Sequence, residues 1–242
     1  MSLANGRPYL AIPGPSVVPD RVLAAMHRAS PNIYEGPLHE MTASIMADLR
    51  RVARTTAHVA VYIVNGHGAW EAANANMFAR GDRALVAITG RFGEGWAHFA
   101  ERQGVQVDRI DFGRQVPADP ARIAAALTAD SGHEIRAVLL THVDTASTVR
   151  NDIAAIRSAM DATGHPALLA VDAIASLGCD PMLMDEWGVD VLVAASQKGL
   201  MAPPGLGFVW FSGKARAAAA RRDLRPPYSG WEPAGDPRDS WQ

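Results

Sequence analysis

Short apolar runs rich in β-branched residues alternate with Ala- and Arg-rich amphipathic segments along most of this 242-residue chain. The runs are typical of strands, and the segments between them are typical of helices. Three runs, AVLL, LLAV and VLVAA, are continuously apolar, as expected for strands buried on both faces of a parallel sheet. The alternation predicts an α/β fold with a mostly parallel sheet, whose ligands bind at the carboxyl ends of the strands.

The pattern places seven strands and seven helices along the chain. Strands are expected at 60–64, 84–88, 105–110, 136–141, 167–171, 190–195 and 206–211. Helices are expected at 20–29, 37–55, 69–79, 95–103, 118–127, 151–163 and 214–222. The strict alternation at 105–110 indicates an edge strand. Residues 223–242, rich in Pro, Gly and Asp, are typical of a linker or of a segment that docks on a partner.

Composition argues against several classes of protein. The net charge of −2, from 23 basic and 25 acidic residues, is unlike that of a nucleic-acid binder. We find no run of about 18 apolar residues and no signal peptide, so we expect no membrane span. The single cysteine, Cys179, excludes a disulfide framework and is expected to be a small buried hydrophobe. Without an H-E-x-x-H motif we expect no metal site, and we expect a cytoplasmic protein.

Polar and small residues follow five of the expected strands. They are Asn65–Gly68, Thr89–Gly93, His142–Thr148, Asp172 and Ser196–Gly199. The carboxyl ends of parallel strands meet at one edge of a sheet, so these residues are expected to gather on one rim.

Each of these features has a functional and a purely structural interpretation. The two glycines of Asn65–Gly68 and the helix that follows suit an anion cradle, or simply a tight turn. Asp172 suits the partner of a buried cation, or a helix N-cap. Phe92 suits a stacking platform for a flat ligand, or a core position.

Lysine is rare in this chain. Among 23 basic residues only Lys198 and Lys214 are lysines. Lys214 begins an Arg- and Ala-rich segment and is expected at the surface. Lys198 follows a buried strand, where burial would favour the neutral, nucleophilic amine, although a strand-end lysine that reaches solvent is the alternative.

An anion cradle, an aromatic face, a buried carboxylate and a reactive amine together match the needs of pyridoxal 5'-phosphate. Its phosphate needs N–H donors, its ring needs a stacking surface, its ring nitrogen needs a carboxylate, and its aldehyde needs an amine. The combination is more specific than any one of its members.

At these residues the sequence resembles the class V aminotransferases of the fold-type I pyridoxal-phosphate enzymes, in particular the alanine–glyoxylate and serine–glyoxylate (serine–pyruvate) branch. The segments that carry the resemblance are Pro13–Ser16, Gly66–Ala73, Thr141–Val149, VDAIASLG at 171–178 and SQKGLMAPPGLGF at 196–208. They cover nearly the whole chain, and the SQK-x-x-x-APPG string is the most specific. The stretch THVDTASTVRND departs from the family, because it lacks the usual glycine after the Ser/Thr pair.

The resemblance implies roles for the residues near the cofactor ring. Lys198 would form a Schiff base with the aldehyde and then move the proton between the substrate Cα and the cofactor. Asp172 would pair with the ring nitrogen. Phe92 would stack on one face of the ring, and Ile174 would press on the other.

The resemblance also implies contacts at the edges of the cofactor. Thr145 would lie near the phenolic oxygen, and Gln197 would offer its side-chain amide to the phosphate. Gly14 would border the amino-acid substrate. Backbone N–H groups for the phosphate would come from Asn65, Gly66 and His67.

The same resemblance implies a three-layer αβα large domain. Its expected boundaries are an N-terminal arm at 1–19, a pyridoxal-phosphate-binding domain at 20–222 and a linker at 223–242 toward a missing C-terminal small domain. The family forms homodimers, and the segment around Tyr34–Gly36 resembles an interface loop. The implied substrates are a small amino acid, serine or alanine, and a 2-oxo acid, glyoxylate or pyruvate.

Three alternatives have different functions. One is another fold-type I enzyme, a lyase or cysteine desulfurase, although the only cysteine does not lie in the C-terminal part that desulfurases use. The second is a truncated homologue that binds the cofactor without turnover. The third, a nucleotide-binding α/β domain, is disfavoured because the chain has no dinucleotide or P-loop fingerprint.

Overall fold

Seven strands form one sheet in the computed structural model, which describes residues 10–220 and 228–231. The strands are β1 (His58–Tyr62), β2 (Arg83–Ile88), β3 (Gln106–Asp111), β4 (Ile135–Thr141), β5 (Leu168–Asp172), β6 (Val191–Ala195) and β7 (Gly207–Phe211). The helices of the described residues are α1 (Asp20–Met26), α2 (Pro37–Ala53), α3 (Gly66–Met77), α4 (Arg91–Arg102), α5 (Pro120–Ala129), α6 (Ile153–Ala162) and α7 (Gly213–Ala220).

The sheet has the strand order β1-β7-β6-β5-β4-β2-β3. Strand β7 runs antiparallel to both of its neighbours, and the other neighbouring pairs are parallel. The other six strands therefore place their carboxyl ends on one rim. The predicted mostly parallel sheet is confirmed, and β3 lies at the edge, as its alternating sequence indicated.

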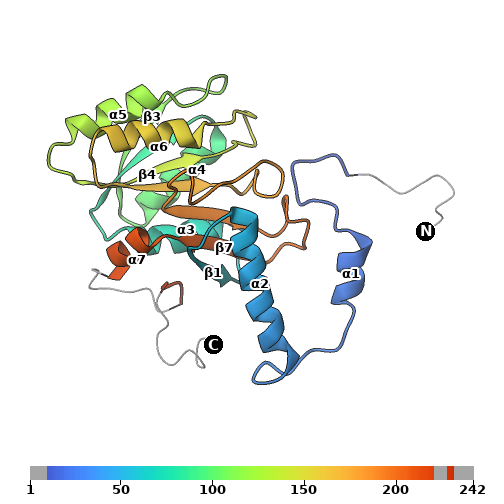
Figure 1. The fold of residues 1–242 in the computed structure, drawn as a ribbon. Coiled ribbons are helices and arrows are strands. Elements are labelled where there is room, and N and C mark those ends of the chain that lie inside the picture. The colour runs from blue at the N-terminus through green and yellow to red at the C-terminus, as the bar shows by residue number, and fades with distance from the viewer. Residues whose placement is uncertain (1–9, 221–227, 232–242) are drawn as a thin grey trace.

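Alternate residues of each central strand enter two separate cores. In β2, Leu85 and Ala87 pack with α2, α5 and α6, whereas Val86 and Ile88 pack with α3, α4 and α7. Figure 1 shows α5 and α6 on one side of the sheet and α3 and α7 on the other. Two apolar strand faces require two helical layers, so the three-layer αβα architecture is confirmed.

Strand β1 lies two residues earlier than its apolar run predicted. Its register with β7 ends where Tyr62 pairs with Gly207, the first residue of β7. The chain beyond has no strand to pair with, so Ile63 leaves the sheet and is 80% exposed. The limit of the strand is set by its partner and not by hydrophobicity.

Helix α4 begins four residues earlier than predicted, inside the apparent glycine-rich loop. The carboxylate of Asp144 accepts the backbone N–H groups of Phe92 and Gly93, at 2.7 and 3.2 Å. The N–H groups in the first turn of a helix lack partners within the helix. Here Asp144, from the loop after β4, accepts two of them, and the N-cap residue Gly90 has no side chain to do so.

The described part of the C-terminal segment, residues 228–231, docks on the domain. The Trp231 ring stacks on Phe211 with centroids 4.4 Å apart, and its backbone N–H donates to Asn76 Oδ1 at 3.0 Å. Tyr62 Oη donates to the Ser229 carbonyl at 2.9 Å. The rest of the predicted linker and the last two residues of the predicted helix 214–222 lie outside the described residues. The domain boundaries stay predictions.

Candidate functional site

Asp172, the last residue of β5, presents a buried carboxylate at the carboxyl rim of the sheet. Its Oδ1 accepts the Ile174 N–H at 2.7 Å, within a turn; no helix of the described structure begins directly after Asp172, so the helix N-cap interpretation is wrong. Its Oδ2 accepts the indole N–H of Trp70 at 3.1 Å, from the first turns of α3. Both oxygens are therefore fixed in direction by two separate elements.

The surroundings of Asp172 hold its proton to neutral pH. Burial raises the pKa of Asp172 to about 7, and the negative charge of Asp144 acts in the same direction. The N–H groups of Ile174 and Trp70 act to lower this pKa, as does the positive charge of Lys198. A buried carboxylate with this pKa is well placed to pair with a cationic group of a ligand.

Lys198 lies three residues beyond the end of β6, next to the N-terminal segment. Its Nζ donates to the Pro13 carbonyl at 3.0 Å, and the Ser16 hydroxyl donates to the Lys198 carbonyl at 3.0 Å. A Cβ added to Gly14 would lie 2.8 Å from Nζ, a contact that the flexible lysine side chain could relieve, whereas the φ of 130° at Gly14 favours glycine at this position. The expectation of a buried lysine is wrong: Lys198 is half-buried, because it lies in the turn after the strand.

Helix α3 begins at Gly66, three residues earlier than predicted, so the glycines predicted to form an anion cradle lie in its first turn. Asn65 caps the helix by accepting the Gly68 N–H at 3.1 Å, which leaves the N–H groups of the preceding turn directed outward. A side chain on Gly66 would lie 2.6 Å from Ile174 Cδ1, so the cradle is in close contact with Ile174. His67 is exposed at the same end of the helix.

An aromatic cluster surrounds the carboxylate and the cradle. The Trp70 ring stacks on Trp96, with centroids 6.0 Å apart, and meets Phe92 edge-on at 6.3 Å. His67 stacks on Phe99 at 5.3 Å and meets Trp70 edge-on at 4.9 Å. Phe92 is half-buried: it packs against the core and leaves part of its side chain accessible to solvent.

Two further predicted residues lie on neighbouring loops. Thr145 is half-buried and follows Asp144, whose Oδ1 accepts the Ala146 N–H at 2.9 Å. The carbonyl of Gln197 accepts the Ser16 N–H at 2.8 Å. The side-chain oxygen of Gln197 is buried without a hydrogen-bond partner in the described structure, as expected of an amide that serves a ligand.

Contacts bring the predicted residues together in two groups. The first group is joined by contacts with Trp70 and with Ile174. Its members are Asp172, Ile174, Gly66, His67 and Phe92. The second group is Gly14, Gln197 and Lys198, joined through the N-terminal segment. The charge of Lys198 acts on Asp172, so the two groups share one electrostatic environment.

Sequence reasoning assigned no role to Trp70 or Asp144. Trp70 lies four residues after Gly66, on the same helix face, which is a signal that could have found it. Asp144 lies three residues beyond the end of the buried strand β4, and Asp172 is the last residue of the buried strand β5. Their similar positions at strand ends are a signal that could have found Asp144. The expectation of a buried Cys179 is wrong, because its side chain is exposed in the turn beside Gly199.

The sequence profile of the family described as Aminotransferase class-V matches residues 8–227. The chain belongs to the class-V aminotransferase family. Members of this family use pyridoxal phosphate. The predicted family, fold and cofactor class are thereby confirmed at the level of the family.

Individual class-V relatives are similar over most of the chain. It is 41% identical to the serine–glyoxylate aminotransferase of Methylorubrum extorquens over 94% of this chain and 58% of the relative. It is 43% identical to the L-aspartate–glyoxylate aminotransferase of Paracoccus denitrificans over 86% and 52%, respectively. The crystal structure of a Thermus thermophilus aspartate aminotransferase of subgroup IV superimposes with a TM-score of 0.81 at 30% identity, over 87% of this chain and 59% of that one. The chain thus spans slightly more than half the length of these relatives.

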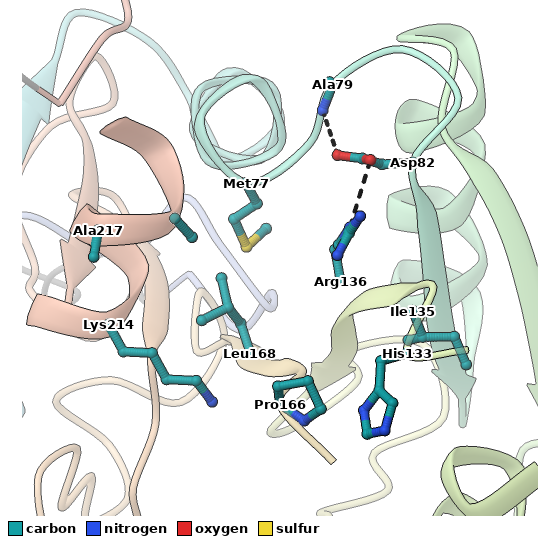
Figure 2. A pocket seen from close by; sticks show the side chains of 11 residues that line it. Met77, Ala79, Asp82, His133, Ile135, Arg136, Pro166, Leu168, Lys214 and Ala217 are labelled. Atoms are coloured by element: carbon teal, nitrogen blue, oxygen red, sulfur yellow. Dashed lines mark hydrogen bonds and ion pairs between the residues drawn. The ribbon is translucent and has the colours of Figure 1, made fainter. Parts of the chain in front are cut away.

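A pocket of about 680 Å³ lies at the opposite rim, where β4 and β5 begin (Figure 2). Its charged groups are engaged within the fold: Arg136 Nε lies 3.6 Å from Asp82 Oδ1, and Lys214 Nζ donates to the Ala167 carbonyl at 2.9 Å. This pocket is lined by none of the residues predicted for the cofactor. The candidate site is therefore the carboxyl rim.

Residues 10–220 and 228–231 contain neither a cluster of metal-binding side chains nor a helix that could span a membrane. No group of three or more His, Cys, Asp or Glu side chains there is placed to hold a metal ion. No helix in these ranges combines the length and the hydrophobicity needed to cross a bilayer.

The stretch that departs from the family pattern contains a strained residue. Thr148 has a φ of 62°, in the left-handed region that glycine tolerates and β-branched residues avoid. We predict that Thr148→Gly stabilises the chain by about 0.5–1 kcal/mol and raises its Tm by about 1–4 °C. Thermal unfolding measures the change, with Thr148→Ala as control. An equal gain in the alanine variant would contradict the strain argument, because alanine keeps the Cβ.

Proposed function

We propose that this chain binds pyridoxal 5'-phosphate at the carboxyl rim and serves in transamination between a small amino acid and a 2-oxo acid. The observation that carries the proposal is the buried carboxylate of Asp172, directed by Trp70 and Ile174 within the electrostatic reach of Lys198. Membership of the class-V aminotransferase family supports it.

The residues present fit the cofactor. The N-terminus of α3 offers N–H groups to a phosphate. The buried, unpaired side-chain oxygen of Gln197 could accept a hydrogen bond from a ligand N–H or O–H, and the NH2 of the same amide would be the donor to a phosphate. Asp172 would accept a hydrogen bond from the ring nitrogen. Phe92 and Ile174 would border the ring faces, and Thr145 would lie near the phenolic oxygen.

When bound, pyridoxal phosphate supplies an aldehyde that condenses with amines and a ring that withdraws electrons from the substrate. The chain supplies orientation and proton transfer. Lys198 Nζ would take the proton from the substrate Cα and return it during the reaction, as a general base and acid. The Asp172 carboxylate would hold the ring in its electron-withdrawing form by pairing with a positive charge.

The finer assignment of substrates follows the relatives. Serine–glyoxylate and L-aspartate–glyoxylate aminotransferases share glyoxylate and differ in the amino donor. We infer that glyoxylate or pyruvate is the acceptor and that serine or alanine is the donor, with Gly14 bordering the substrate beside Lys198.

The test is to add pyridoxal phosphate to the purified chain and measure its visible absorbance and its transamination of serine and alanine with glyoxylate. We expect a bound, coloured cofactor and formation of glycine. Colour without turnover would favour the cofactor-binding homologue, and release of sulfide from cysteine would favour the desulfurase. Absence of cofactor binding would contradict the proposal.

We also propose that a second copy of the chain covers α1. This helix buries none of its side chains and stands apart from the α/β body (Figure 1). Its Leu23 and Met26 are 47% and 56% exposed, which favours association. Light scattering should give twice the 25.8 kDa of one chain. Leu23→Glu should lower that mass, Val116→Glu on another surface should not, and a monomeric wild type would contradict the homodimer.

A further inference from the structure

Asp144 is a completely buried carboxylate that joins two loops of the rim. Its Oδ2 accepts the N–H groups of Phe92 and Gly93 at the start of α4, at 2.7 and 3.2 Å. Its Oδ1 accepts the N–H of Ala146, in the loop that contains Thr145, at 2.9 Å. One side chain thus fixes the first turn of α4 relative to the loop after β4.

The fit around this carboxylate is close. A Cβ added to Gly90 would lie 2.3 Å from the Asp144 Cγ and 2.4 Å from its Oδ1. The positive end of the α4 dipole and three N–H donors offset the cost of burying the charge. Small movements of this group therefore require the start of α4 to move with it.

We propose that Asp144 is a positioning residue of the cofactor site, which sets Phe92 relative to Thr145 and places a second negative charge near Asp172. The inference rests on the proposed function, because Phe92 and Thr145 matter only if they border the cofactor. Asp144 is completely buried, and both of its carboxylate oxygens are engaged by backbone N–H groups. It acts through the residues that it holds.

The charge of Asp144 has a separate, measurable effect. After burial, it is the second contribution that raises the pKa of Asp172, and the charge of Lys198 opposes it. Removing the charge should therefore lower the pH at which Asp172 releases its proton. A side chain that only supported packing would leave this midpoint unchanged.

The experiment compares Asp144→Asn with Asp152→Asn. Asp152 caps α6 through the Ala155 N–H at 3.0 Å, so the control makes the same chemical change at another helix start. The first readout is the affinity for pyridoxal phosphate, titrated by absorbance. The second is the pH midpoint of the stability change that disappears in Asp172→Asn.

We expect Asp144→Asn to weaken pyridoxal-phosphate binding by about ten- to a hundred-fold, because its amide cannot accept on both sides and misplaces Phe92. We also expect its Asp172 midpoint to move to lower pH, and we expect Asp152→Asn to change neither readout. Wild-type affinity in a folded Asp144→Asn chain would overturn the inference, and so would an unmoved midpoint.

Asp144→Glu tests the position of the carboxylate separately from its charge. It also provides a test if Asp144→Asn does not fold. It retains the charge but lengthens the side chain, so we expect weaker cofactor binding with a nearly unchanged Asp172 midpoint. Wild-type cofactor affinity in this variant would overturn the positioning role. A wild-type chain that binds no cofactor would contradict the proposed function instead, while the midpoint would still test the electrostatic effect of Asp144.

Discussion

Replacing Lys198 by alanine is expected to abolish covalent attachment of pyridoxal phosphate and to reduce transamination by about 10⁴-fold or more. The variant loses both the amine that bonds to the aldehyde and the group that moves the Cα proton, and proton transfer alone contributes about 10²–10⁴-fold. Borohydride reduction of the loaded wild type should leave the cofactor on the peptide that contains residue 198. The variant should retain no label after denaturation.

The chain offers a matched control, since Lys214 is its only other lysine. Lys198→Arg and Lys214→Arg both keep the positive charge and both remove a primary amine. We expect only Lys198→Arg to lose the covalent label. Labelling of residue 214, or labelling that survives in Lys198→Ala, would contradict the assignment.

Asp172→Asn is expected to lower transamination on the order of 10³-fold, because a neutral amide cannot stabilise a positive ring nitrogen as a carboxylate does. The amide also cannot accept hydrogen bonds at both positions now occupied by Trp70 and Ile174. The activity of the variant, measured at saturating cofactor, separates this effect from weaker binding. Activity within about ten-fold of wild type would contradict the role of Asp172.

The same variant tests the pH dependence of stability without the cofactor. Folded Asp172 keeps its proton to about pH 7, whereas its ordinary pKa is 3.8. Between these values the folded chain binds more protons than the unfolded chain, so stability falls as the pH rises, by about 4 kcal/mol in total. Asp172→Asn should remove this decrease.

Other groups titrate in the same pH range, so the stability curve of Asp172→Asn is subtracted from that of the wild type to remove their contribution. Burial lowers the pKa of His142, which gives the opposite trend, stability that rises with pH. The difference between the wild-type and Asp172→Asn curves isolates Asp172. Asp119→Asn, at the exposed N-cap of α5, should leave the decrease in place. Wild-type stability that is flat or rising after this subtraction would contradict the raised pKa.

Features encoded in continuous segments were predictable from the sequence. All seven strands were predicted, six from short apolar runs and β3 from its alternating pattern, and the polar residues after five of them do gather on one rim. The direction of β7 was not encoded in this way, because its apolar run is the same for either direction. The glycine-rich start of α3 was predictable to within three residues for the same local reason, since the capping Asn65 and the two glycines are close together in the sequence.

Features that depend on distant partners were not predictable. The start of α4 depends on Asp144, which is 52 residues from Phe92. The partial burial of Lys198 depends on the segment that contains Pro13. The indole that directs Asp172 comes from 102 residues earlier. In each case periodicity shows the element but not the side chain that contacts it.

The hydrogen bond between Pro13 and Lys198 joins residues 185 positions apart. During translation at about 5–20 residues per second, the two are therefore made about 10–40 seconds apart. The N-terminal segment is made long before Lys198, which lies three residues beyond the end of β6. This wall of the site therefore forms only after the chain has been made as far as Lys198, and a nascent chain shorter than 198 residues cannot assemble it.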